Sequence, residues 1–180
     1  MGGRDNVETE GTLTPETVAE ARAEYESLVP AAKAATREAA KAMSFDRAEY
    51  DERVTPDVIA SVRDALFVSL LTVHVGSREA FETWREDHPG YETVLAGSGN
   101  AECVVWHAPP FADRAVAATF NEERGAAVGT LRRQAFGRLY RDRLPESDDD
   151  SSRGDDTSDD LSESDDASDD DRSTESDDVS

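Results

Sequence analysis

The chain has 180 residues, of which 41 are acidic and 19 are basic, and its formal net charge is −22. The single cysteine, Cys103, excludes an intrachain disulfide and a zinc site built from several cysteines. No apolar run approaches the roughly 20 residues that cross a bilayer, and the first residues lack the apolar core of a signal peptide. We therefore expect a cytoplasmic protein without a membrane span.

Acidic residues are concentrated at the C-terminal end. Residues 146–180 hold 17 acids against two arginines, which leaves 24 acids and 17 bases in residues 1–145. Lys33 and Lys41 are the only lysines. This acid-rich, lysine-poor composition predicts a halophilic protein, because carboxylates keep a surface hydrated and soluble in concentrated salt. At about 1 M salt the Debye length is only about 3 Å, so the repulsion between these charges is screened.

The composition also predicts the domain organisation. An Asp/Ser-rich segment cannot bury enough apolar surface to offset the entropy of ordering it. We therefore expect a disordered acidic tail at 146–180, a globular domain at 14–145 and a flexible leader at 1–13.

Four helices are predicted in the first half of the chain. Thr14-Pro15-Glu16 combines an N-cap, a proline at the first helical position and an acid in the first turn, which predicts a helix to about Leu28. Residues 31–43, which are rich in alanine, and the short segment 47–53 predict the next two. A second start signal, Thr55-Pro56-Asp57, begins the fourth helix. Apolar and small residues recur in it at a 3.6-residue period, and we expect them to face the core: Val58, Ile59, Val62, Ala65, Leu66 and Ser69.

The second half is predicted to mix strands and helices, because its hydrophobic periodicity changes along the chain. In chain order we expect a strand at 71–75, a helix at 78–87, strands at 91–96 and 103–106, and helices at 112–120 and 122–144. The two later strands flank the turn Gly97-Ser98-Gly99-Asn100 and are expected to pair as an antiparallel hairpin. The fold class is therefore α+β, a mostly helical single domain with a small β-α-β-β sheet element.

His74, Cys103 and His107 are the candidates for metal binding or nucleophilic catalysis. Cys103 and His107 are about 13 Å apart along an extended strand, which is too far to share an ion or to act as a nucleophile and its base. We expect no metal, no cofactor and no catalytic residues.

Basic residues form two groups. Lys33, Arg37 and Lys41 are spaced by four and share one helix face. The final predicted helix is crowded with arginines. Together they define a candidate anion-binding site: Lys33, Arg37, Lys41, Arg132, Arg133, Arg138 and Arg141. The alternative interpretation is that neighbouring acids pair with these bases and that the arginine stems cover the edge of the core. Nucleic acid is a disfavoured ligand at high salt, because salt weakens phosphate contacts steeply.

Two segments carry a resemblance to a known family. AAKAATREAAKAMSFDRAEYDERVTP (31–56) and VGTLRRQAFGRLYRDRL (128–144) resemble a small haloarchaeal family known as a domain of unknown function. The resemblance covers about residues 11–144, implies a halophilic single domain and adds no chemistry. The acidic tail departs from the short C-termini expected in that family.

Three functional hypotheses follow. The first is a non-enzymatic protein-interaction or regulatory module that docks a protein partner, or a second copy, through apolar residues on its helices. The second is an anion- or nucleic-acid-binding module that uses the basic helix faces. The third is an enzyme of unknown type that uses His74, Cys103 or His107.

Overall fold

The computed structural model describes residues 6–145. They contain a five-stranded mixed sheet whose strands are arranged in the order β1-β2-β4-β5-β3. The parallel pair is β3 with β5, and the other neighbouring strands are antiparallel. The strands are β1 (Glu8–Glu10), β2 (Val73–Ser77), β3 (Glu92–Ala96), β4 (Cys103–His107) and β5 (Arg114–Phe120). The predicted disordered tail at 146–180 lies outside the described residues.

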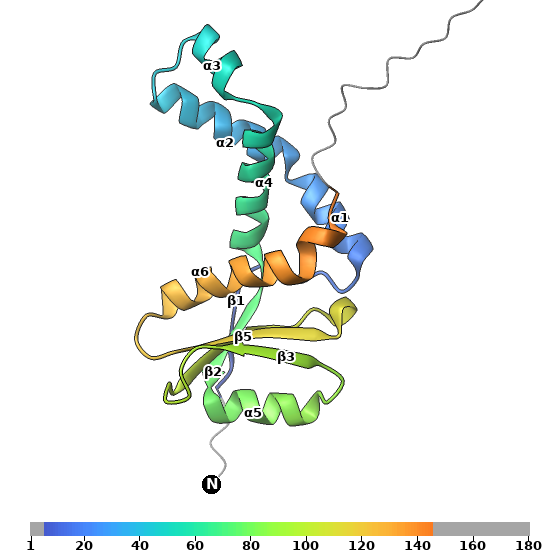
Figure 1. Ribbon diagram of the computed structural model, residues 1–180. Coiled ribbons are helices and arrows are strands. Elements are labelled where there is room, and N and C mark those ends of the chain that lie inside the picture. Colours follow the sequence, from blue (N-terminus) through green and yellow to red (C-terminus); the bar gives the residue numbers. More distant parts are fainter. Residues whose placement is uncertain (1–5, 146–180) are drawn as a thin grey trace, which may run out of the picture. The chain divides into compact units, whose positions relative to one another are not determined.

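Helices cover both faces of this sheet. In Figure 1, α6 runs along one face and α5 along the other, while α4 leads away from the sheet toward α2 and α3. The helices are α1 (Val18–Ser27), α2 (Val29–Ala42), α3 (Arg47–Arg53), α4 (Pro56–Leu70), α5 (Arg78–Asp87) and α6 (Arg124–Ala135). A π-helix, Phe136–Tyr140, and a 3-10 turn, Arg141–Arg143, continue α6. Among the described residues, no helix has both the length and the apolar character needed to cross a membrane.

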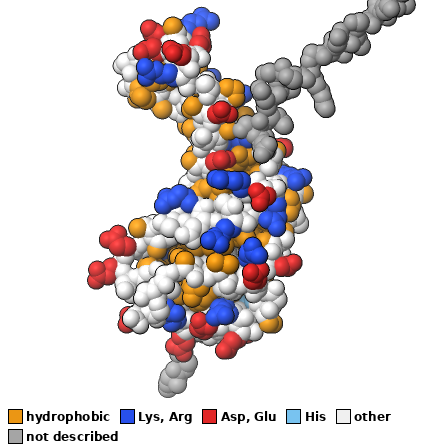
Figure 2. Space-filling view, in the orientation of Figure 1, with side chains coloured by type: hydrophobic (Ala, Val, Ile, Leu, Met, Phe, Trp, Pro, Cys, Tyr) orange, Lys and Arg blue, Asp and Glu red, His pale blue; other side chains and the backbone are white. Residues whose placement is uncertain are grey.

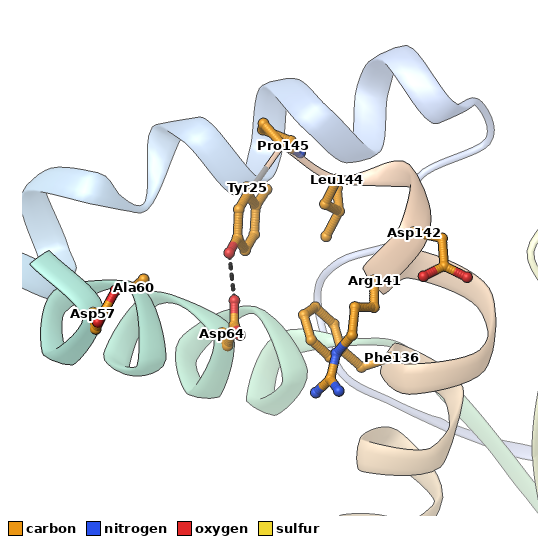
Figure 3. A pocket seen from close by; sticks show the side chains of 9 residues that line it. All are labelled: Tyr25, Asp57, Ala60, Asp64, Phe136, Arg141, Asp142, Leu144 and Pro145. Atoms are coloured by element: carbon orange, nitrogen blue, oxygen red, sulfur yellow. Dashed lines mark hydrogen bonds between the residues drawn. The ribbon is translucent and has the colours of Figure 1, made fainter. Parts of the chain in front are cut away.

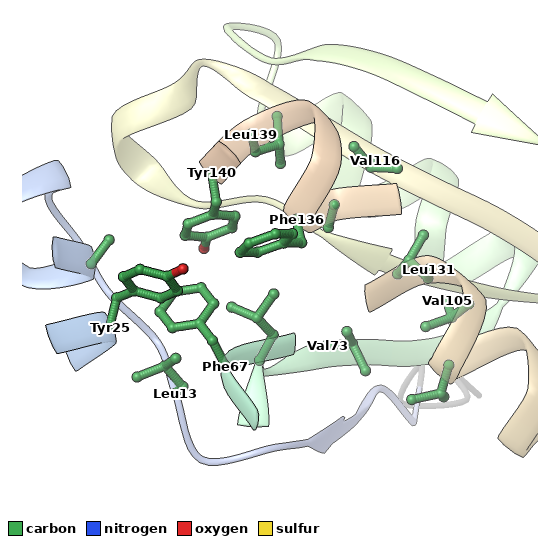
Figure 4. Packing of buried hydrophobic residues seen from close by; sticks show 14 of the residues in the cluster. Leu13, Tyr25, Phe67, Val73, Val105, Val116, Leu131, Phe136, Leu139 and Tyr140 are labelled. Carbon is green, nitrogen blue, oxygen red and sulfur yellow. The ribbon is translucent and has the colours of Figure 1, made fainter. Parts of the chain in front are cut away.

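The main core is built around Phe67 of α4, which is fully buried. Its ring centroid lies 5.6 Å from that of Tyr25, 5.9 Å from that of Phe136 and 5.3 Å from that of Tyr140 (Figure 4). The Tyr25 and Tyr140 rings meet Phe67 edge to face, an arrangement that adds to the free energy of burial. Phe67 therefore joins α4 to α1 and to the C-terminal helical segment. A smaller cluster, Phe81, Val104, Trp106 and Ala117, packs α5 on the sheet.

Several predicted elements are confirmed. The α+β class holds, and α3 and α5 have the predicted bounds. Side-chain N-caps explain why these helices begin where they do: Asp46, Thr55 and Ser77 each accept a hydrogen bond from the backbone N–H three residues later. Asp46 and Glu49 form a reciprocal capping box.

The N-terminal predictions need two corrections. Residues 8–13 are not a flexible leader, because Glu8–Glu10 forms an edge strand on β2 and Leu13 is buried beside Leu71. Three polar residues carry no strand periodicity, so this pairing left no signal in the sequence. The first helix begins after Thr17, whose side chain caps it, and the Thr14 hydroxyl instead donates to that of Thr72 at 2.8 Å.

The predicted helix at 112–120 is wrong, because Arg114–Phe120 forms β5. This strand lies inside the sheet with consecutive residues Ala115, Val116 and Ala117 all buried, so the alternation typical of a half-exposed strand is missing. The predicted hairpin is wrong for the same reason. β5 inserts between β3 and β4, pairing in parallel with β3 and antiparallel with β4.

Replacing Phe67 tests the role of the aromatic cluster. We expect Phe67→Ala to lower the free energy of unfolding by about 3–5 kcal/mol, because it removes a fully buried ring and leaves a cavity. Denaturant unfolding followed by circular dichroism measures the change. The matched control is Met43→Ala at a side chain that is 64% exposed, which should change stability by less than about 0.5 kcal/mol. Equal effects of the two substitutions would contradict this description of the core.

Candidate functional site

The lysines of the candidate anion-binding site lie on the outer side of α2. Lys33, Arg37 and Lys41 are all exposed. Lys41 pairs with Glu38 at 2.7 Å, and this hydrogen bond and charge hold the pKa of the Glu38 carboxyl below its usual value. Lys33 and Arg37 therefore carry most of the uncompensated positive charge on this face.

The arginines of the C-terminal segment have different surroundings. Arg132 is mostly buried, and its guanidinium donates to the backbone carbonyls of Leu71 at 2.8 Å and Glu10 at 3.1 Å. Arg133 donates to the Thr130 hydroxyl at 3.2 Å, whereas Arg138 and Arg141 are exposed. Figure 2 shows basic side chains gathered over α6 and the neighbouring α1. An anion-binding surface here stays a prediction, and Arg132 is the member most committed to its own backbone.

The two candidate strands of the metal hypothesis are neighbours, since β2 pairs with β4 and His74 lies opposite Trp106. Among residues 6–145, however, no three histidine, cysteine or acidic side chains are grouped closely enough to hold a metal ion. Cys103 is half-buried at the start of β4, and His107 lies buried at its end.

His107 is buried and makes a hydrogen bond with each of its two ring nitrogens. Its Nδ1–H donates to the Thr72 carbonyl at 2.7 Å, because a carbonyl oxygen can only accept. Its Nε2 therefore accepts from the Tyr140 hydroxyl at 2.8 Å. Burial lowers the pKa of His107 from 6.5 to about 4, outweighing the Thr72 carbonyl, which favours the protonated ring. Burial also raises the pKa of Tyr140. This neutral pair satisfies two polar groups inside the core.

A pocket of about 560 Å³ opens between α1, α4 and the C-terminal segment. In Figure 3, the Tyr25 hydroxyl and the Asp64 carboxylate point toward each other, and Tyr25 donates a hydrogen bond to Asp64. Burial raises the pKa of Tyr25 to about 12, helped by Asp64 and opposed by Arg63, whose guanidinium lies 4.0 Å from the Tyr25 ring centroid. Tyr25 therefore stays protonated at neutral pH and acts as a hydrogen-bond donor.

The other charged groups of this pocket are mixed in sign. Its lining includes three carboxylates, those of Asp57, Asp64 and Asp142, and one guanidinium, that of Arg141. The Arg141 guanidinium lies 5.8 Å from the Phe136 ring centroid, beside α4 in Figure 3. The lining therefore carries two more negative than positive groups, and the Arg63 guanidinium beside Tyr25 offsets one of them.

The side of α4 that faces away from Phe67 carries a groove of about 590 Å³, which shares Asp57 with the pocket. We call this surface the α4 groove, and its lining residues are Asp57, Val58, Ser61, Val62, Ala65, Leu66 and Ser69. Asp57 is the one charged residue among them. We predicted that the periodic residues of this helix face the core, and that prediction is wrong. Val58 is 38% exposed and Ala65 is also exposed. The core lies instead on the side of the helix that carries Phe67.

The α4 groove was not predicted, although the sequence holds a signal for it. Of the 15 residues of α4, only Asp57, Arg63 and Asp64 are charged, and apolar residues occupy its whole circumference. A helix that is apolar all round needs cover on every side. Within residues 6–145, the core packs against one side of α4 and α2 packs against another. The buried residues of α2 are small: Ala32, Thr36 and Ala40.

Comparison with known proteins identifies a family. The model of a protein family described as "Family of unknown function (DUF5809)" matches residues 12–141. The match agrees with the expected domain of unknown function and with nearly the same residues, while haloarchaeal origin stays a prediction from the resemblance and a halophilic character a prediction from composition. No curated protein and no solved structure matches the chain.

The buried His107 makes stability depend on pH. The unfolded chain binds a proton on this ring near pH 6.5 and the folded chain only near pH 4, so acidification through this window favours unfolding. We expect His107 to contribute a loss of about 3 kcal/mol in the free energy of unfolding over that range. Denaturant unfolding at pH 7 and pH 4.5 measures it. His107→Gln should lose less stability on acidification than the wild type, and exposed His88→Gln should behave as the wild type. Parallel losses in all three proteins would contradict the assignment.

Proposed function

The chain belongs to this family of unknown function, and we propose that it is a protein-interaction module that docks a partner on the α4 groove. The observation that carries the proposal is an apolar groove lined by seven residues of one helix, with a single charge at its edge. Exposed contiguous apolar surface of this kind is typical of interaction sites, because it is otherwise unfavourable in water.

The spacing of the groove residues favours a helical partner. Val58, Val62, Ala65 and Ser69 alternate by four and three residues, the spacing of a coiled-coil seam. The small residues Ala65 and Ser69 leave room for a second backbone to approach. From residue 58 to residue 69 the seam is about 17 Å long, which corresponds to three turns of helix. A partner of about three to four turns would cover it in the helix-in-groove mode.

The location of the groove also supports a docking role. Figure 1 shows α4 leading away from the sheet toward α2 and α3. A partner bound here would lie beside α2 and α4 without displacing the Phe67 core, which lies on the other side of the helix.

Anion binding is the second candidate, and the basic side chains over α6 and α1 favour it (Figure 2). The two candidates use different residues. Binding of a polyanion such as heparin would weaken on replacing Arg133, Arg138 and Arg141 together with Gln. It would be indifferent to a change in the α4 groove.

Site-specific cross-linking tests the docking function. With a photoreactive residue at Ala65, we expect a discrete adduct in cells that express the protein naturally, and a much weaker one with the same residue at Ala34 on the exposed side of α2. Val62→Glu should abolish the Ala65 adduct by placing a charge in the groove, whereas Ala34→Glu, with the same change of charge, should leave it intact. Circular dichroism confirms that both variants are folded. Adducts of equal strength at Ala65 and Ala34, or an Ala65 adduct that survives Val62→Glu, would refute groove docking.

A further inference from the structure

We propose, resting on the docking function of the α4 groove, that its occupant is an amphipathic helix of another protein with lysine or arginine along one flank. The apolar stripe of that helix would lie on Val58, Val62, Ala65 and Ser69. Its basic flank would lie beside Asp57 and Asp64.

The distribution of charge around α4 carries this inference. Asp57 and Asp64 are seven residues apart, so they lie on the same flank of the helix, two turns from each other. Asp57 lines both the α4 groove and the pocket that contains Asp64, so the groove and this pocket, with its three carboxylates, adjoin at Asp57. Nothing else that lines the groove is charged.

The pocket between α1, α4 and the C-terminal segment accommodates a long cationic side chain. It measures about 560 Å³, and its apolar lining includes Ala60, Phe136 and Leu144, which suit the methylene stem of a lysine or arginine. The Asp64 carboxylate already accepts from the Tyr25 hydroxyl, and it retains acceptor capacity for a second donor. Arg141 and Asp142 also line this pocket, and their charges offset each other.

A second copy of this chain fits the groove less well. When two copies of one helix pack antiparallel about a two-fold axis, each flank meets the same flank of its partner. In such a pair the acidic flanks of the two copies lie on the same side, and each copy carries a formal net charge of −22, so the two copies repel each other in dilute salt. Residues 146–180 carry 17 acids against two bases, so their charge does not complement that of Asp57. Charge complementarity therefore selects a foreign, basic helix.

Three synthetic peptides of about 15 residues, the length of α4, test the inference. All share one apolar stripe at heptad spacing, and they differ on one flank, which carries lysine, glutamine or glutamate. Affinity is measured by fluorescence anisotropy against the full chain, at the lowest salt at which its circular dichroism spectrum is native. We expect the lysine peptide to bind about tenfold more tightly than the glutamine peptide, the effect of two close ion pairs, and the glutamate peptide to bind most weakly.

Variants identify the groups responsible. Asp57→Asn should remove part of the lysine preference, and Asp57→Asn combined with Asp64→Asn should remove all of it while the glutamine peptide binds as before. Asp87→Asn at the end of α5, on the other face of the sheet, is the matched control and should leave the preference unchanged. Raising the salt should reduce the preference as well.

The outcomes separate this inference from the docking function. Equal binding of all three peptides, weakened by Val62→Glu, would retain the groove as a docking surface and overturn the basic partner. Tightest binding of the glutamate peptide would do the same. Failure of every peptide to bind would overturn both proposals. Self-association of the chain that Val62→Glu abolishes would assign the groove to a second copy instead.

Discussion

The burial of Phe67 decides what the rest of α4 can do. This ring is enclosed by Tyr25, Phe136 and Tyr140, so one side of the helix is fixed against α1 and the C-terminal segment. An α-helix cannot turn about its axis without withdrawing such a residue from the core. The apolar residues on the far side, among them Val58 and Ala65, are therefore held outward. Exposing these apolar residues to water is unfavourable for the isolated chain, and covering them with a second apolar surface is favourable.

Local signals predicted much of the helical structure. N-caps at Asp46, Thr55 and Ser77 act within one helical turn, so the starts of α3, α4 and α5 could be read directly from the sequence. Sheet pairing depends on residues far apart in the chain, and there the prediction failed. The alanines of β5 fit a helix as well as a strand in isolation, and only their position between β3 and β4 selects the strand. The edge strand β1 consists of three polar residues, so its pairing with β2 leaves no hydrophobic pattern in the sequence.

The candidate site was only partly predictable for a related reason. Periodicity correctly marked Val58, Val62 and Leu66 as one apolar face, but it does not reveal whether the same chain or another molecule covers that face. Composition drew attention to the scarce lysines and the arginine-rich C-terminal segment, and one of those arginines, Arg132, joins β1 to the end of α4 through backbone carbonyls. The pocket around Tyr25 and Asp64 depends on three elements meeting in space, a relation that no local pattern contains.

The central claim is that the α4 groove is open in the isolated protein, and thiol accessibility measures this directly. In a Cys103→Ser background, Ala65→Cys places a thiol in the groove and Ala135→Cys places one in the core, where Ala135 is 1% exposed. Under native conditions a maleimide should modify the first at a rate close to that of the denatured chain, whereas the second should react far more slowly. Equal protection of both thiols in the isolated protein would mean that another part of the chain, or a second copy, already covers the groove, and it would contradict the claim.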